Sequence, residues 1–264
     1  PKDGEYDFRF LLANGKYLKK ARYPESGKLI HASEWKVAWT STFGNGWATP
    51  PTKEDLTTMI YKNEDLPADF VAENAELSIF HEWDESYVGV ASVDRVTKKV
   101  FFSTPAFHPP GAFNHHTYVV WNTREGMTSP LSWYFDKTQN RIYIYPDEEM
   151  EQNGITAFVP VARSVIQLNE AKNILLENFT AECCTPPLIS CGFGAEYLSA
   201  AMDGKDCTGI TVKNVTVRNS GGTGIKFTGK AQIILNCRTF MLGGAGIWCG
   251  INDEYLFVSY EEME

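Results

Sequence analysis

The sequence CTGITVKNVTVRNSGGTGIKF at residues 207–227 is followed 22 positions later by a second copy of its core, ILNCRTFMLGGAGIWC at residues 234–249. The alignment places Val212 on Ile234 and Gly224 on Gly246. A repeat of this length, with alternating apolar positions and glycine-rich corners, is typical of one coil of a right-handed parallel β-helix. The sequence therefore predicts an all-β fold whose carboxy-terminal part is a solenoid.

An earlier coil fits the same register with an offset of 36 residues, which places Asn178 on Asn214. Asn178, Asn214 and Asn236 are then expected to form a ladder inside one corner, where their amides bond to one another. An asparagine inside such a ladder would be out of reach of a glycosyltransferase. We therefore expect the glycosylation sequons at Asn178 and Asn214 to be unused.

Residues 1–160 are predicted to form an antiparallel β-rich region, because short runs of alternating polarity are separated by Gly, Asn, Asp and Pro. We expect hairpins within 92–102 and 133–145 and a short helix at 53–61. Residues 161–264 are assigned to the coils. The second repeat ends near Cys249, so the open end needs a cover: the tail, further coils or a protein partner.

The composition excludes several functions. With 24 Lys plus Arg against 33 Asp plus Glu, the net charge is −9, which argues against nucleic acid and anionic membranes as partners. The six cysteines contain no CxxC pair, and the five histidines contain no HxxxH motif. We therefore expect no zinc site and no cofactor. Calcium held by turn carboxylates stays open, although no loop has a recognised spacing.

Several segments occur in the order seen in a group of right-handed parallel β-helix proteins. They are NGKYLKKARYP at 14–24, HEW at 81–83 with VD at 93–94, SWYFD at 132–136, IYIYP at 142–146, VIQL at 165–168 and NILLEN at 173–178. Over about residues 8–250 the chain resembles the carbohydrate-active members of this group, which are similar to glycoside hydrolase family 141. The resemblance implies a secreted, periplasmic or other extracellular glycoside hydrolase that acts on a polysaccharide without a cofactor.

Two other functions remain open at this point. A non-catalytic structural or carbohydrate-binding β-helix module that assembles with a partner is favoured by the short coil stack. A polysaccharide lyase is the third reading. It is disfavoured because a lyase needs a Lys/Arg cluster or calcium to neutralise a uronate, and the sequence shows no such cluster.

Candidate catalytic residues follow from the chemistry of glycosidic cleavage, which uses two carboxyl groups about 5–5.5 Å or about 6.5–9.5 Å apart. Asp203 precedes one coil and Asp253 comes after two further turns. At about 4.8 Å per rung, their backbones are expected to lie about 9.6 Å apart if both are on one face. Asp206 and Glu254 are substitutes for either residue.

Two further residues are candidates for substrate binding. Trp248 alternates with the apolar Ile247 and Cys249, so its indole is expected to point outward, as a platform for a sugar ring or as packing under the tail. Arg22 is a candidate either to bind an acidic sugar or to brace the hairpins, and we favour the brace.

Overall fold

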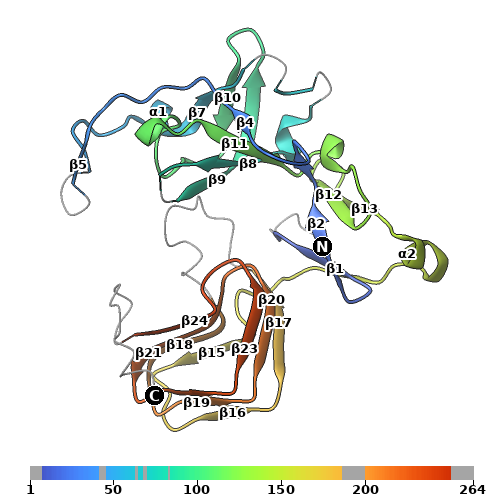
Figure 1. Ribbon diagram of the computed structural model, residues 1–264, viewed down its shortest axis with the longest axis vertical. Helices are drawn as coiled ribbons and strands as arrows, with labels where there is room; N and C mark the ends of the chain where they lie inside the picture. The colour runs from blue at the N-terminus through green and yellow to red at the C-terminus, as the bar shows by residue number, and fades with distance from the viewer. Residues whose placement is uncertain are drawn as a thin grey trace. The chain divides into compact units, whose positions relative to one another are not determined.

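The computed structural model describes residues 8–41, 46–62, 65–67, 70–82, 84–185 and 200–250. These residues are nearly all in strands and connecting loops, with few and short helices (Figure 1). The chain forms two compact units. Unit 1 comprises the described residues of Leu18–Ile155, and unit 2 those of 8–17, 156–185 and 200–250. Within the described part, no helix has both the length and the apolar character needed to cross a membrane.

Unit 1 is an antiparallel β structure. Its main sheet has the order β3-β11-β8-β9-β10-β7, with β4 also paired to β11. The bounds are β2 Lys16–Lys20, β3 Arg22–Tyr23, β4 Leu29–Ile30, β5 Trp39–Ser41, β6 Gly46–Trp47, β7 Thr58–Ile60, β8 Glu76–Phe80, β9 Glu85–Asp94, β10 Lys99–Phe102, β11 Thr117–Trp121, β12 Ser132–Asp136, β13 Arg141–Tyr145, α1 Lys53–Thr57, α2 Glu148–Asn153, and the 3-10 helices η1 Ala72–Asn74, η2 Ala112–Asn114 and η3 Arg124–Gly126.

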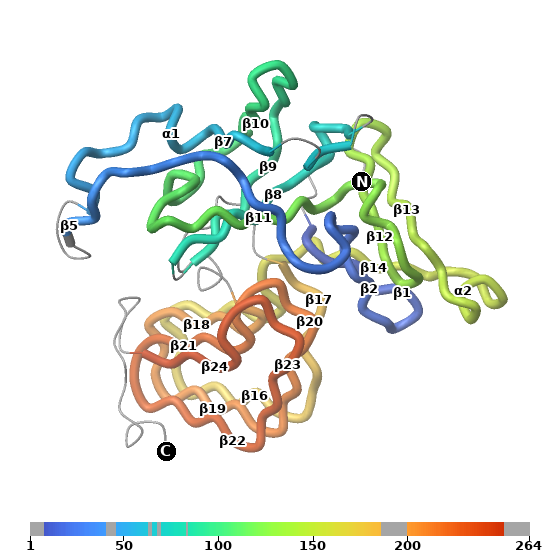
Figure 2. Tube along the Cα trace, turned by 45° about the horizontal axis from the view of Figure 1, so that its top comes forward, coloured from blue at the N-terminus to red at the C-terminus, as the bar shows by residue number. Residues whose placement is uncertain are grey.

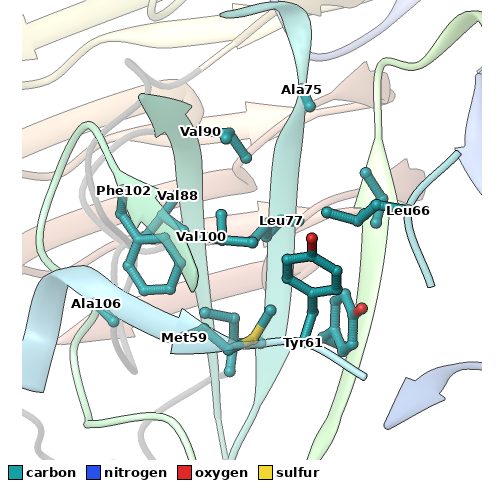
Figure 3. Packing of buried hydrophobic residues seen from close by; sticks show 13 residues of the cluster. Met59, Tyr61, Leu66, Ala75, Leu77, Val88, Val90, Val100, Phe102 and Ala106 are labelled. Atoms are coloured by element: carbon teal, nitrogen blue, oxygen red, sulfur yellow. The ribbon is translucent and has the colours of Figure 1, made fainter. Parts of the chain in front are cut away.

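One face of this sheet carries the core of unit 1. Met59, Leu77, Val88 and Val100 are almost completely buried there and come from four different strands (Figure 3). A strand that places every second side chain on one face buries a continuous apolar layer, and Leu77 shows this most clearly, since it lies between the polar Glu76 and Ser78.

Both predicted hairpins of unit 1 are present. β12 pairs with β13 from Ser132↔Tyr145 to Asp136↔Arg141, and β9 pairs with β10 through Val93↔Val100. β12 also pairs in parallel with β2, and the buried indole of Trp133 donates a hydrogen bond to the carbonyl of Leu18 at 3.1 Å.

The helix expected at 53–61 is shorter than predicted. α1 starts after Thr52, which forms a capping box with Asp55, and it ends at Thr57. The chain then continues as β7, which pairs with β10. The tertiary pairing and the β-branched threonines end the helix, because β-branched residues fit a strand better than a helix.

Unit 2 contains coils that stack on one another (Figure 2). A short pair, β1 (Leu11–Ala13) with β14 (Ala157–Phe158), also belongs to this unit. Each coil then adds one strand to each of three parallel sheets. These are β15 (Ile166–Asn169), β18 (Ala200–Thr208), β21 (Thr223–Lys230) and β24 (Ile247–Gly250); β16 (Leu175–Glu177), β19 (Thr211–Lys213) and β22 (Ile233–Leu235); and β17 (Thr180–Cys184), β20 (Thr216–Ser220) and β23 (Arg238–Leu242).

The register of the coils agrees with the repeat seen in the sequence. Val212 lies beside Ile234 in the sheet, and Leu176 lies beside Val212, so the 22-residue and 36-residue offsets are both confirmed. Inward-facing residues of successive coils form a core around Val212, Ile225 and Phe227. Cys237 and Cys249 pack against this core, and Cys183, Cys184, Cys207, Cys237 and Cys249 are free thiols.

The asparagine ladder is present, but its predicted place inside the corner was wrong. Asn214 donates to Oδ1 of Asn178 at 3.1 Å, and Asn236 donates to Oδ1 of Asn214 at 2.7 Å. All three residues are exposed and have positive φ angles of 62°, 54° and 50°. The left-handed backbone turns each side chain outward, so burial does not protect the two sequons.

Candidate functional site

A column of polar and aromatic residues runs across the coils on the sheet β15-β18-β21-β24. The backbone register aligns Gln167 with Asp203, Asp203 with Lys226, and Lys226 with Trp248. We call these four residues the coil column. Neighbouring strands of a sheet are about 4.8 Å apart, so a ligand that lies across the coils meets one member of the column per coil.

The column faces away from the core of unit 2. Met202 and Ile225, which precede Asp203 and Lys226, are fully buried, and successive residues of a strand point to opposite faces. Trp248 therefore lies on the outer face, as the sequence predicted. The Nζ atom of Lys226 is 5.3 Å from the centre of the Trp248 ring, a cation–π contact that orients the indole.

Asp206 lies on the same strand as Asp203 but in a different environment. The pairing of β18 with β21 is interrupted between Gly204 and Cys207, and Asp206 has a φ of 53° within this bulge. Its backbone N–H donates to Oγ1 of Thr228 at 2.8 Å. Bulges redirect side chains, so Asp206 does not continue the coil column.

The two remaining carboxylate candidates, Asp253 and Glu254, lie outside the described residues. Among the described residues, the coil column therefore contains a single carboxyl group, that of Asp203. The predicted separation of Asp203 and Asp253 stays a prediction.

Arg22 belongs to unit 1, and among the described residues its side chain contacts groups of the local fold. Its Nη2 atom donates to the carbonyl of Gly27, and its guanidinium lies 5.4 Å from the ring centre of Trp121. The backbone of Gly126 packs so closely against that of Arg22 that a Cβ there would lie 2.6 Å from the Arg22 nitrogen. These contacts join β3 to β11 and η3, as a brace would, and the choice between a brace and a site for an acidic sugar stays a prediction.

The histidines form a cluster that sequence reasoning missed. His31 lies 5.3 Å from His116 and His81 lies 5.4 Å from His108, measured between ring centres. The pKa of His81 is lowered to about 3, mainly by burial and to a smaller extent by the charges of His108, His31 and His115. All five histidines are thus neighbours, although they are far apart in the sequence and share no motif.

Burial keeps the inner part of this cluster neutral at pH 7. The pKa of His31 is lowered to about 3 by burial and by His116, and burial lowers the pKa of His108 although the nearby Asp84 raises it. His108 also packs against Trp39 and Trp47, with ring centres 5.6 and 5.8 Å away. The inner cluster is therefore a buried aromatic group of neutral imidazoles, with the buried Asp84 carboxyl 3.7 Å from His108.

Neither metal binding nor serine chemistry follows from the cluster. In the described ranges, no group of three or more His, Cys, Asp or Glu side chains is placed to hold a metal ion. Ser86 shares a hydrogen bond of 2.8 Å with Nε2 of His81, but its side chain is completely buried and also accepts from the N–H of Phe107. A buried hydroxyl with both partners in place is not available to a substrate.

No protein-family model matches the sequence, and no curated protein matches it either. The structure is similar to a solved structure of a protein named glycoside hydrolase, with a TM-score of 0.57 and 16% sequence identity. The match covers 90% of this chain and 54% of the other, so the chain spans about half the length of that structure. At this identity the likeness shows that the folds are similar.

Proposed function

We propose that this chain is a carbohydrate-active protein, specifically a polysaccharide-directed glycoside hydrolase or the amino-terminal part of one. Unit 2 would be a right-handed parallel β-helix of the kind found in proteins similar to glycoside hydrolase family 141, with the coil assignment covering residues 161–264. The observation that carries the proposal is the coil column, in which Asp203, Lys226 and Trp248 occupy one outward position on successive coils.

The column suits an extended glycan for three physical reasons. The Trp248 ring offers an apolar face to the C–H groups of a sugar. The Asp203 carboxylate accepts, and the Lys226 ammonium donates, hydrogen bonds of the kind that sugar hydroxyls make. The likeness of the fold to a protein named glycoside hydrolase supports a glycan rather than another extended polymer.

Hydrolysis needs a second carboxyl group across the scissile bond from Asp203. In the proposal, Asp253 or Glu254 supplies it, with Asp206 as the alternative on the same strand. The column orients the chain, and the two carboxyl groups act as general acid and as base or nucleophile. The action would take place outside the cytoplasm, where polysaccharides are accessible.

A second candidate is a non-catalytic carbohydrate-binding or structural module that assembles with a partner. It is favoured by one observation: within the described residues the column has only one carboxyl group. Such a module would use the same column to bind the glycan while it assembles with a protein partner.

The test uses the full chain, a panel of neutral and acidic polysaccharides, and measurements of both binding and released reducing ends. Trp248→Ala should weaken binding, whereas Asp203→Asn should abolish hydrolysis and leave binding within a few-fold of wild type. Phe240→Ala is the matched control, because Phe240 also carries a cation, Arg238, at 6.0 Å but lies on the sheet β17-β20-β23.

The possible outcomes separate the two candidates. If wild type binds a polysaccharide but hydrolyses none of the panel, the result supports the non-catalytic module. Full hydrolysis by Asp203→Asn contradicts the catalytic proposal. If wild type binds no glycan, or if Phe240→Ala weakens binding as much as Trp248→Ala, the assignment of the column as a glycan site is wrong.

A further inference from the structure

Unit 1 contains a cleft whose lining residues all lie between Val71 and Ile144, so none of them belongs to the coil column. Its volume is about 630 Å³, within the range of about 300–1,000 Å³ that small-molecule sites occupy. It is bounded by η1, η3 and the hairpin β12–β13. Its walls comprise Val71, Asn74, Asn122, Thr123, Arg124, Glu125, Met127, Tyr134, Asp136, Thr138, Gln139, Tyr143 and Ile144.

Three polar side chains form a preorganised group on one wall. The Asn74 amide is oriented by the backbone N–H of Lys137, which donates to its Oδ1 at 2.7 Å. Its Nδ2 donates to the hydroxyl of Tyr134 and, at 3.4 Å, to Oδ1 of Asp136. All three side chains are more than nine-tenths buried, so their positions are determined by the fold before any ligand arrives.

The Tyr134 hydroxyl retains a hydrogen-bond donor for a ligand. The oxygen accepts from Asn74, but its own proton has no acceptor among the side chains and carbonyls that the structure describes. Burial and the charge of Asp136 raise the pKa of Tyr134, so the phenol stays protonated at neutral pH. A buried donor without an acceptor is costly, and a ligand oxygen in the cleft would satisfy it.

The charges around this hydroxyl select against anions. Hydrogen bonds from Thr138, Gln139 and Asn74 lower the pKa of Asp136, which keeps it a carboxylate. Glu125 raises the pKa of Tyr134 and Arg124 lowers it, so the charges of both side chains reach the Tyr134 hydroxyl. Two carboxylates and one guanidinium leave a net negative charge, which disfavours phosphates and uronates.

The rest of the cleft lining beside these polar groups is largely apolar and aromatic. The rings of Tyr134 and Tyr143 are stacked, with centres 6.0 Å apart and an angle of 26°, and Val71, Met127 and Ile144 add aliphatic surface. A ligand that fits must therefore carry both apolar C–H faces and several hydroxyl groups. Neutral sugars combine these two properties.

We infer that the cleft of unit 1 is a binding site for a neutral saccharide. The Tyr134 hydroxyl donates to a sugar oxygen, Asp136 and Glu125 accept from sugar hydroxyls, and Tyr143 packs against the ring. This site shares no residue with the coil column and does not rest on the function proposed for unit 2. It would add a second point of attachment on the same chain, whether or not the coils hydrolyse a glycan.

The test is titration calorimetry of the full chain with neutral di- to hexasaccharides of hexoses and pentoses, and with oligogalacturonates of the same lengths. We expect binding of a neutral oligosaccharide and none of the galacturonates. Tyr134→Phe should weaken this binding about five- to tenfold, the effect of one hydrogen bond. Tyr145→Phe is the matched control: Tyr145 lies on β13 outside the cleft, and its substitution should leave the affinity unchanged.

A second variant guards against a loss of structure. Tyr134→Phe removes the nearer of the two acceptors of the Asn74 amide. Glu125→Gln, which removes only a charge, is therefore measured beside it, with thermal melts of both. Trp248→Ala separates this site from the coil column. The inference is overturned if no neutral oligosaccharide binds, if galacturonates bind equally well, if neither cleft variant changes the affinity, or if Trp248→Ala abolishes all binding.

Discussion

Replacing Glu76 should destabilise unit 1 more than any surface charge does. Glu76 is buried on β8, with a side chain that is 2% exposed, and it accepts hydrogen bonds from Lys20, Lys137 and the Tyr87 hydroxyl. The Lys20 side chain is itself only 8% exposed. The Glu76→Gln substitution therefore leaves a lysine ammonium buried without its counter-charge.

The magnitude follows from two independent estimates. Burial raises the pKa of Glu76, but Lys20 and Lys137 outweigh it and lower the pKa from 4.5 to about 2. That difference corresponds to about 3 kcal/mol of stability at neutral pH. Breaking a buried ion pair by removing one partner typically costs about 3–5 kcal/mol. We expect Glu76→Gln to lose about 3 kcal/mol in the free energy of unfolding.

The pH dependence has a definite sign. Because the pKa of Glu76 is lower in the folded state, the unfolded chain binds the proton first as the pH falls. The contribution is complete above about pH 4.5 and is lost as the pH falls toward about 2. In Glu76→Gln, the free energy of unfolding should depend less on pH between about 4.5 and 2 than it does in wild type.

The assay is urea unfolding of wild type and variants, followed by tryptophan fluorescence. Glu54→Gln is the control, because the Glu54–Lys99 pair has a similar distance of 2.9 Å but side chains that are 69% and 31% exposed, and such a pair contributes at most about 1 kcal/mol. The double variant Lys20→Met with Glu76→Met should recover most of the loss, because it removes both buried charges. A Glu76→Gln variant no less stable than Glu54→Gln would refute the reasoning.

Three further outcomes are expected. The pKa values of His31 and His81 are lowered to about 3, mainly by burial, so the free energy of unfolding should fall as the pH drops from about 6.5 toward 3. Each histidine contributes up to about 1.4 kcal/mol per pH unit, and His31→Leu should make this pH dependence less steep in urea titrations. Gly204→Ala should lower the melting temperature, because the new Cβ would lie 2.0 Å from the Phe227 ring; an unchanged melting temperature would contradict the coil packing. Asn214→Ala should cost about 1–2 kcal/mol, whereas Asn214→Gly should cost less because glycine tolerates the φ of 54°, and equal losses would argue against the backbone part of this reasoning.

The coils were predictable because a parallel stack imposes its period on the sequence. Inward-facing residues in register must share size and polarity, so Val212 and Ile234 align both in the sequence and in the sheet. The direction of the asparagine ladder was not predictable from the same pattern. A repeated asparagine marks a left-handed corner, but only the backbone geometry shows that the amide points outward.

The features of unit 1 left no such trace in the sequence. Asn74 and Tyr134 are 60 residues apart, and an antiparallel sheet brings them together through pairings that do not repeat. The histidines behave in the same way, since His31 and His116 meet only because β4 and β11 pair beside them. Local patterns predicted the hairpins and helices that surround these sites, but not the contacts between them.

The two proposed sites differ in kind. In unit 2 the outward position recurs on successive coils, so Asp203, Lys226 and Trp248 form a linear series, and the site proposed there would suit a polymer of repeating units. In unit 1 the contacts do not repeat, and the site proposed there would use a single buried group, Asn74 with Tyr134 and Asp136, to bind one ligand end. If each site binds a saccharide, Trp248→Ala should lower the affinity for long chains more than for disaccharides, and Tyr134→Phe should weaken both to the same extent. Titrations of each variant with a length series would show this, and an equal loss for all lengths in Trp248→Ala would argue against the division of roles.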